Sequence, residues 1–335
     1  MSDILQQLID GKDLSQQQAE AFFTEVVNGN VEPALMASVL TALKIKGETA
    51  TEIAGAAIAI RAAATPFPEN DLRLVDCVGT GGDGHSTINI STTAAIVAGA
   101  CGLNVAKHGN RSVSSQSGSA DLLESFGVNL TLSPEKALES IKTSGCSFLF
   151  APNYHSGFRH AAPVRAAMGV RTLFNILGPL VNPASPKVML LGVYTPELLK
   201  PMAKALQLTG VERAWVVHGS GLDEVAIHGE TQVIEIDGDQ LIEKSVIPSD
   251  FGLETHTLES IKGGLPADNA RYSMAVLSGN GEQAHIDAVI INAAALIYLA
   301  GKSDNLRGAA SIVKDTLKQG SAVKTLQSMI EVSNV

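Results

Sequence analysis

The chain has 335 residues, 45% of them hydrophobic, so it can bury the core of one large domain or of a large and a small domain together. Its formal net charge of −10 argues against a nucleic-acid partner, because a protein that binds the phosphate backbone needs a basic surface. No apolar run is long enough to span a bilayer, and the N-terminus lacks the features of a secretory signal, so we expect a cytoplasmic protein with no membrane partner.

The first part of the chain predicts helices only. Ser15 with Gln18, and Thr49 with Glu52, match the capping-box pattern, and apolar residues at helical spacing follow each pair. A connector broken by prolines comes next, at residues 65–71. The beginning of the chain should therefore form a helical unit, set apart from the later residues by this connector.

From residue 74 onward, short apolar runs alternate with segments of helical pattern. The apolar runs predict strands buried on both faces, at residues 74–78, 103–106, 147–150, 188–193 and 214–217. A hairpin with an Asp-Gly turn is expected over 231–246, and helices are expected over 267–278, 284–301 and 305–331. This order predicts an α/β fold with a central, mostly parallel sheet.

The segment Asp76–Gly84 comes after the first predicted strand and packs four glycines into six residues. Gly79, Gly81 and Gly84 satisfy the dinucleotide-binding pattern, but no helix is expected before Ser91 and no acidic residue stands where the ribose would be held, so we disfavour such a site. A glycine-rich loop before a helix N-terminus suits phosphate, because free N–H groups and the helix dipole favour anions. Further donors at that helix start come from Asn89, Ser91, Thr92 and Thr93.

A second polar loop, Lys107–Ser115, comes after the predicted strand 103–106 and brings two cations, Lys107 and Arg111. Ligands of such sheets bind at the carboxyl ends of the strands, so we expect this loop to face the same crevice as the glycine-rich loop. The loop has the composition of an anion-binding site.

An acidic pair, Asp223 and Glu224, comes after the predicted strand 214–217 in a glycine-flanked turn. Adjacent carboxylates can converge on one cation from a turn, and Mg²⁺ typically takes one or two carboxylates together with substrate phosphates. With two phosphate-type loops in the same chain, we interpret this pair as a Mg²⁺ site.

Taken together, these motifs closely resemble the anthranilate phosphoribosyltransferase family. The resemblance is carried by Asp76–Gly84, Asn89–Thr93, Lys107–Ser115, Gly118–Asp121, Arg171–Pro183 and Leu222–Glu224. It implies Mg²⁺-dependent transfer of phosphoribose from phosphoribosyl pyrophosphate to the amine of anthranilate, with release of pyrophosphate, in tryptophan biosynthesis. It also implies a homodimer of the nucleoside phosphorylase/phosphoribosyltransferase type, with an all-helical domain over 1–70, which helices from 161–183 could join in space, beside an α/β domain over 71–335.

The resemblance further implies three sets of contacts, residue by residue. Contacts to phosphoribosyl pyrophosphate fall on Gly79, Gly82, Asp83, Thr87, Asn89, Ile90, Ser91, Thr92, Lys107, His108, Gly109, Asn110, Arg111, Ser112, Val113, Ser114, Ser115 and Ser119. Mg²⁺ ligands fall on Ser91, Asp223 and Glu224. Contacts to anthranilate fall on Gly79, Asn110 and Arg165, with Pro152, His155, Arg165 and Gly178 lining the acceptor route.

Arg165 and His155 are expected to position the acceptor. An arginine suits its carboxylate, because a guanidinium can donate two parallel charge-assisted hydrogen bonds. An aromatic amine is already nucleophilic without losing a proton, so His155 is assigned to positioning and not to general base catalysis. No constellation for covalent catalysis is evident in the sequence.

Two alternatives remain open at the level of sequence. Pyrimidine nucleoside phosphorylases share the implied architecture, but they resemble Asp-Lys-His-Ser-Thr-Gly-Gly at the first loop, where this chain has Asp76-Cys-Val-Gly-Thr-Gly-Gly. A relative that has lost the reaction and binds nucleic acid would require a basic groove and an eroded acidic pair, whereas Asp223 and Glu224 are intact here.

Overall fold

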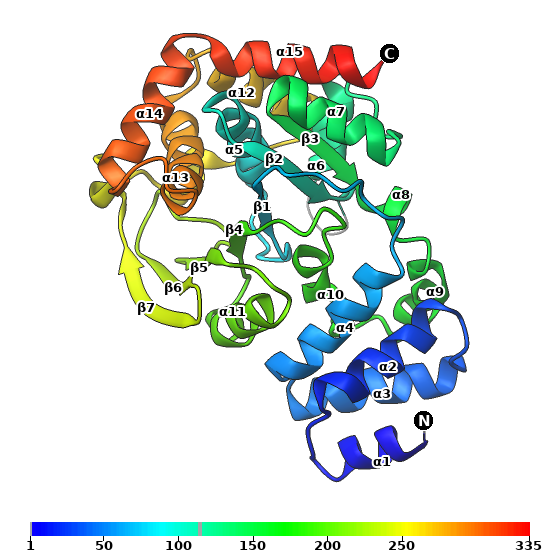
Figure 1. Ribbon diagram of the computed structural model, residues 1–335. Helices are drawn as coiled ribbons and strands as arrows, with labels where there is room; N and C mark the ends of the chain where they lie inside the picture. Colours follow the sequence, from blue (N-terminus) through cyan, green and yellow to red (C-terminus); the bar gives the residue numbers. More distant parts are fainter. Residues whose placement is uncertain (1, 113–115) are drawn as a thin grey trace.

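The computed structural model describes residues 2–112 and 116–335, so the predicted contacts at Val113, Ser114 and Ser115 lie outside the described residues. A helical bundle lies at one end of a seven-stranded sheet that is flanked by further helices (Figure 1). The fold class predicted from the sequence is confirmed.

The bundle begins with four helices: α1 (Ser2–Ile9), α2 (Gln16–Val27), α3 (Pro33–Lys46) and α4 (Ala50–Ala62). Both predicted capping boxes are present, since the Ser15 hydroxyl accepts from the Gln18 N–H and the Thr49 hydroxyl accepts from the Glu52 N–H. Each box satisfies backbone donors that the first helical turn leaves unpaired.

A later segment completes this bundle. Helix α9 (Phe158–Met168) and the short α10 (Phe174–Leu177) share one hydrophobic cluster with α2, α3 and α4. The ring of Phe174 stands edge-on to Phe23 and to Phe158, with centroids 5.8 and 5.7 Å apart. Residues 161–177 therefore pack against the N-terminal helices, while the division of the chain at residue 70 stays a prediction.

The sheet has the strand order β3-β2-β1-β4-β5-β6-β7. Its strands are β1 (Leu74–Gly79), β2 (Asn104–Gly109), β3 (Cys146–Phe150), β4 (Val188–Gly192), β5 (Arg213–Gly219), β6 (Thr231–Asp237) and β7 (Gln240–Val246). The first five in chain order run parallel, and β6 and β7 form the predicted antiparallel hairpin. Each predicted strand is present, and β2 and β5 extend up to three residues beyond the prediction at their carboxyl ends.

Helices cover both faces of the sheet (Figure 1). The helices of this part of the chain are α5 (Ile90–Ala100), α6 (Ser119–Ser125), α7 (Pro134–Ser144), α8 (Ala151–Tyr154), α11 (Leu199–Leu208), α12 (Pro266–Leu277), α13 (Gln283–Leu299), α14 (Leu306–Lys318) and α15 (Ser321–Ser333). Short 3₁₀ turns lie at Gly178–Leu180, Pro196–Leu198, Pro248–Phe251 and Leu258–Ile261. The single helix predicted over 305–331 is wrong: Gly320, at φ +69°, ends α14 and starts α15 in a left-handed conformation.

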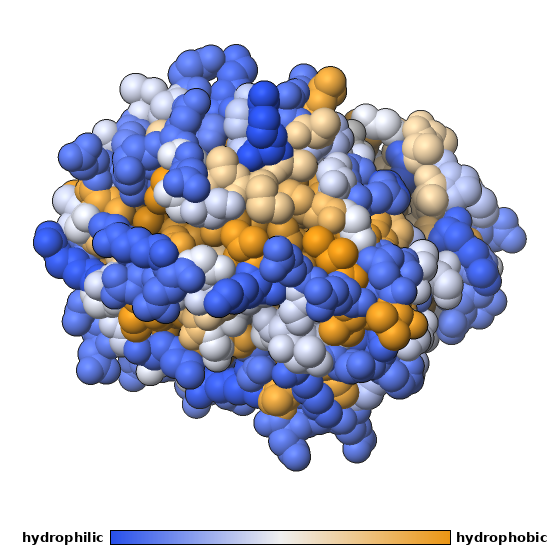
Figure 2. All heavy atoms as spheres, turned by 90° about the horizontal axis from the view of Figure 1, so that it is seen from above, coloured by the Kyte–Doolittle hydropathy of each residue, from blue (hydrophilic) through white to orange (hydrophobic). Residues whose placement is uncertain are grey.

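The 17-residue helix α13 is buried along most of its length and packs against α5 and α14. No helix within residues 2–112 or 116–335 is both long enough and apolar enough to cross a membrane. Seen from above, hydrophilic residues cover most of the molecular face, while hydrophobic residues gather in a band across its middle (Figure 2).

Candidate active site

The predicted site residues cluster at the carboxyl ends of the parallel strands. The chain runs from β1 outward to β2 and β3 on one side, and to β4 and β5 on the other, so the strand order reverses between β1 and β4. Ligands of open α/β sheets bind at such a switch point. The glycine-rich loop follows β1, the second polar loop follows β2, and the acidic pair follows β5.

The structure brings the acidic pair against the glycine-rich loop and the start of α5. The backbone N–H of Gly81 donates to Asp223 Oδ2 at 2.6 Å, and the N–H of Ser91 donates to Glu224 Oε1 at 3.1 Å. Gly79 is required by this approach, because a Cβ there would lie 2.2 Å from the Asp223 carboxylate. Segments more than 130 positions apart in the chain thus meet in one place.

The start of α5 is joined to the second loop through Asn89. Its side-chain oxygen accepts from Asn269 Nδ2 at 2.7 Å and from Ser117 Oγ at 3.1 Å, while its amide donates to the Ser117 carbonyl at 3.0 Å. The Thr92 hydroxyl donates to Ser119 Oγ at 2.9 Å. The donors expected at this helix start therefore lie beside the loop that follows β2.

Asp223 and Glu224 are only partly exposed and are closely surrounded by protein atoms. Burial raises the pKa of Asp223 to about 7, and the neighbouring Asp83 charge adds to the rise. Burial likewise raises the pKa of Glu224 to about 8, with the Asp223 charge adding to it and Lys107 opposing it. Carboxyl groups whose charges repel one another in this way suit a cation, because its charge would offset the repulsion.

Lys107 points into the protein between β1 and β2, and its ammonium donates to the Cys77 carbonyl at 2.5 Å. The amide of Asn182 donates both to Asp76 Oδ2 and to the Ala106 carbonyl, each at 2.8 Å. Burial raises the pKa of Asp76 to about 6, and the Lys107 charge works against the rise. Lys107, Asp76 and Asn182 therefore form buried polar contacts between β1 and β2, just beyond the last paired residues, Val75 and Val105.

Arg111 does not stand free in the second loop, contrary to the expectation of an anion-binding cation. Its guanidinium makes two bonds to the Glu124 carboxylate, at 2.7 and 2.9 Å, and one to Asp121 Oδ1 at 3.0 Å. It also lies over the Phe150 ring, 5.8 Å from the centroid. Acidic groups of α6 therefore already offset the charge of Arg111.

Two histidines from different parts of the chain meet beside Gly178. His108 and His155 lie with their Nε2 atoms 3.2 Å apart, and His108 Nδ1 donates to the Gly178 carbonyl at 3.2 Å. Burial lowers the pKa of His108 to about 3 and that of His155 to about 4, so both rings are neutral near pH 7. Since a carbonyl only accepts, His108 Nε2 carries no proton and accepts from His155.

Arg165 lies on α9, half-buried, with its guanidinium 5.3 Å above the centroid of the Phe174 ring. Burial lowers the pKa of this arginine. It makes no ion pair in the part of the chain that the structure describes, so its donors face no competing carboxylate there. Pro152, also predicted on the acceptor route, is exposed near the start of α8.

The remaining predicted contacts lie along the same two loops. Asp83 Oδ1 accepts from the His85 N–H at 3.0 Å, and Thr87 forms an isolated β-bridge with Lys262. Ile90 is buried, and Gly82 contacts the guanidinium of Arg171. Gly109 ends β2, Asn110 Oδ1 accepts from the Arg111 N–H at 2.7 Å, and the Ser112 N–H donates to Asp121 at 3.1 Å. These residues follow β1 and β2 in the chain, whereas Pro152, His155, Arg165 and Gly178 lie between the start of α8 and the 3₁₀ turn after α10.

Sequence reasoning missed several groups that hold the site together. Asn182 and Asp76 are buried polar residues inside the motifs that carried the resemblance, and their strong polarity among apolar neighbours was the available signal. Asn269, which bonds Asn89, lies on α12 one turn before the buried Ser273. Arg171, which donates to the Gly82 carbonyl at 2.6 Å, begins one of those motifs, but the motif alone assigns it no role.

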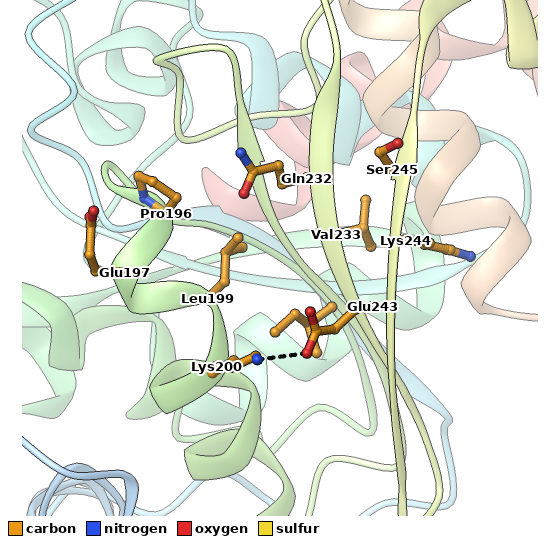
Figure 3. A pocket seen from close by; sticks show the side chains of 10 residues that line it. Pro196, Glu197, Leu199, Lys200, Gln232, Val233, Glu243, Lys244 and Ser245 are labelled. Atoms are coloured by element: carbon orange, nitrogen blue, oxygen red, sulfur yellow. Dashed lines mark ion pairs between the residues drawn. The ribbon is translucent and has the colours of Figure 1, made fainter.

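A separate groove of about 560 Å³ lies between α11 and the β6–β7 hairpin (Figure 3). Lys200 on α11 and Glu243 on β7 form an ion pair of 2.7 Å there. None of the predicted site residues lines this groove, so it is not part of the site at the strand ends.

Comparison with protein families matches the two parts of the chain to two related models. Residues 71–323 match the α/β domain of the glycosyl transferase family, and residues 2–64 match its helical bundle domain. Anthranilate phosphoribosyltransferase from Colwellia psychrerythraea is 64% identical over 336 aligned positions, covering 100% of this chain and 92% of that protein. The enzyme from Vibrio parahaemolyticus is 53% identical and covers 98% of this chain and 99% of its own length.

Solved structures give the same result. Anthranilate phosphoribosyltransferase from Thermus thermophilus superposes with a TM-score of 0.94 at 42% identity, covering 99% of this chain and 100% of that one. The enzyme from Saccharomyces cerevisiae, solved with phosphoribosyl pyrophosphate and Mg, has a TM-score of 0.90 at 30% identity, covering 99% and 97%. The same yeast enzyme has been solved with 4-fluoroanthranilate.

Proposed function

The chain belongs to the anthranilate phosphoribosyltransferase family, and from that membership we propose how its own residues carry out the transfer of phosphoribose from phosphoribosyl pyrophosphate to the amine of anthranilate. The products are N-(5-phosphoribosyl)anthranilate and pyrophosphate, and the reaction is a step of tryptophan biosynthesis. The observation that carries the proposal is the convergence of two phosphate-type loops and an acidic pair at one end of the sheet.

The donor would bind across the two loops. Backbone N–H groups of the glycine-rich loop and of the α5 start, with the α5 dipole, favour its pyrophosphate. The proposed contacts are Gly79, Gly82, Asp83, Thr87, Asn89–Thr92, Lys107–Ser115 and Ser119. Lys107 would attract the donor's phosphates through its charge and not through a direct contact, because its ammonium is bonded to the Cys77 carbonyl.

Ser91, Asp223 and Glu224 would hold Mg²⁺ together with the donor phosphates. The donor set fits, since Mg²⁺ prefers oxygen ligands and typically takes one or two carboxylates with substrate phosphates. When bound, the ion supplies neutralisation of the negative charge that the leaving pyrophosphate develops.

Anthranilate would bind between the strand ends and the α8–α10 segment. Arg165 faces no competing carboxylate in the described residues, which leaves its guanidinium available for the acceptor carboxylate. Gly79 and Asn110 would contact the acceptor, and Pro152, His155 and Gly178 would line its route. The amine needs no general base, so these residues act by orientation and by excluding water.

We also propose a cytoplasmic homodimer formed through the helical bundle. Ile9 at the end of α1 is 64% exposed and Ile45 near the end of α3 is 82% exposed. Helices α1 and α3 are neighbours, so these apolar side chains lie on adjoining helices. A second subunit that packs on these two helices would cover both side chains.

The function is tested by mixing the protein with phosphoribosyl pyrophosphate, MgCl₂ and anthranilate and following the loss of anthranilate fluorescence. We expect turnover that stops when EDTA removes the metal. The double variant Asp223→Asn with Glu224→Gln should turn over more slowly and require more Mg²⁺, because two anionic ligands are lost. Absence of any decay at micromolar wild-type enzyme would reject the function, and an unchanged Mg²⁺ requirement in the variant would reject the metal ligands.

A further inference from the structure

Arg171 lies between α9 and α10 and has no role in the proposed function. Its Nη2 donates to the Gly82 carbonyl at 2.6 Å, and its guanidinium stacks on Tyr194, 4.5 Å from the ring centroid. The side chain is exposed, so neither contact is imposed by burial. The arrangement places an arginine of the acceptor-side segment directly on the glycine-rich loop.

The fit between Arg171 and Gly82 depends on the absence of a side chain at position 82. A Cβ there would lie 2.3 Å from Arg171 Nη2, and Gly82 has φ +84°, which side chains rarely adopt. Gly82 therefore has two roles: it allows the left-handed turn of the loop, and it leaves space for the guanidinium of Arg171.

No carboxylate within residues 2–112 and 116–335 offsets the positive charge of Arg171, in contrast to the charges of Arg111 and Arg213. Arg111 pairs with Asp121 and Glu124, and Arg213 pairs with Glu235. Within residues 2–112 and 116–335, Arg171 instead contacts a neutral carbonyl and an aromatic ring. Its charge and its remaining N–H donors are therefore available beside a loop suited to phosphate.

Different anchors hold the two halves of the glycine-rich loop. Toward β1, the Thr80 N–H donates to the Gly192 carbonyl at 2.9 Å, and the Thr80 hydroxyl accepts from the Tyr194 N–H at 3.2 Å. Farther along, Gly82 is bonded by Arg171. Because Arg171 comes after α9, which bears Arg165, this bond connects the proposed acceptor-binding helix with the donor loop.

We infer that Arg171 is a positioning residue, which fixes the glycine-rich loop through the Gly82 carbonyl and contributes positive charge for the donor's pyrophosphate. The inference rests on the proposed function for its kinetic part, and on the loop contact alone for its structural part. Lysine cannot reproduce the contact, because a flexible ammonium lacks the planar group that bonds Gly82 while stacking on Tyr194.

The test compares Arg171→Lys and Arg171→Gln with Arg73→Lys, an exposed arginine just before β1, at the opposite end of that strand. The Arg171 variants should raise the KM for phosphoribosyl pyrophosphate about tenfold, as expected for loss of one charge-assisted bond, with kcat lowered less than about threefold and the thermal midpoint unchanged. The Arg73 variant should match wild type. A Tyr194→Leu variant should raise the same KM, and its effect should be less than additive with Arg171→Lys.

Hydrogen exchange separates this inference from the proposed function. Without substrate, the amides of residues 82–85 should exchange faster in Arg171→Lys than in wild type, whether or not the wild type turns over anthranilate. Unchanged exchange together with an unchanged KM would overturn the role of Arg171. A wild type without turnover, but with faster loop exchange in the variant, would reject the function and leave the loop contact supported.

Discussion

The ion pairs of Arg111 within the protein compete with any ligand that this side chain could bind. It is bound by Glu124 and Asp121, so a donor phosphate that needs Arg111 must compete with those carboxylates. Glu124→Gln removes the two-point pair while leaving Asp121 to cap α6. We expect the KM for phosphoribosyl pyrophosphate to fall about two- to fivefold, the range of a weak exposed ion pair.

The matched control is Glu139→Gln, which removes an exposed ion pair with Lys136 on α7. Initial rates at varied concentrations of phosphoribosyl pyrophosphate give the KM of each variant and of the wild type. A KM that rises in Glu124→Gln would show that Glu124 supports Arg111 in its working position and does not compete for it.

The buried pair His108 and His155 predicts a fall in stability at acidic pH. Their folded-state pKa values, about 3 and about 4, lie below the usual 6.5, so the unfolded chain binds more protons between pH 7 and pH 4. The free energy of unfolding should therefore decrease as the pH falls, by about 2 kcal/mol for one such histidine between pH 7 and pH 5. Denaturant titrations at several pH values should show a flatter dependence for His155→Asn, and parallel curves for variant and wild type would contradict this.

At the scale of elements, the buried carboxylate of Glu52 joins the α1–α2 connection to the start of α4. It accepts from the Leu14 N–H and the Thr49 N–H, each at 2.8 Å, and pairs with Lys46 at 3.0 Å. Glu52→Ala should lower the free energy of unfolding by about 3 kcal/mol, because buried donors lose their acceptor. Glu52→Gln should cost less, and the exposed Glu32→Ala should change stability by less than about 1 kcal/mol in the same urea titration.

Elements were predictable from the sequence where one local signal dominates. Continuous apolar runs located the parallel strands because both faces of those strands are buried. The break between α14 and α15 was missed, because Gly320 stands among good helix formers and a single glycine is tolerated within a helix.

The site was predictable in its loops and less so in its contacts. Glycine density and the acidic pair located the loop after β1 and the turn after β5. The pairing of Arg111 with α6, the inward course of Lys107 and the bond from Arg171 to Gly82 depend on which segments the fold brings together. No local pattern encodes those partners.

At the scale of the whole molecule, the proposed dimer makes a direct prediction. Ile45→Asp would place a charge in the proposed interface, and sedimentation velocity should then show a smaller species than wild type. Leu265→Asp, at a comparably exposed leucine in the α/β part, should leave the sedimentation coefficient unchanged. A wild type that already sediments as a monomer would remove the proposal.

The bundle that α9 and α10 complete has a consequence for biosynthesis of the chain itself. During translation, α4 leaves the ribosome about a hundred residues, and α2 about 130 residues, before the phenylalanines of α9 and α10 that pack against the bundle. The apolar surface of the nascent N-terminal helices therefore stays exposed to solvent while β1, β2 and β3 are synthesised. A fragment ending at residue 70 should be loosely packed and bind a hydrophobic dye, and one that extends past α10 should bind less of it.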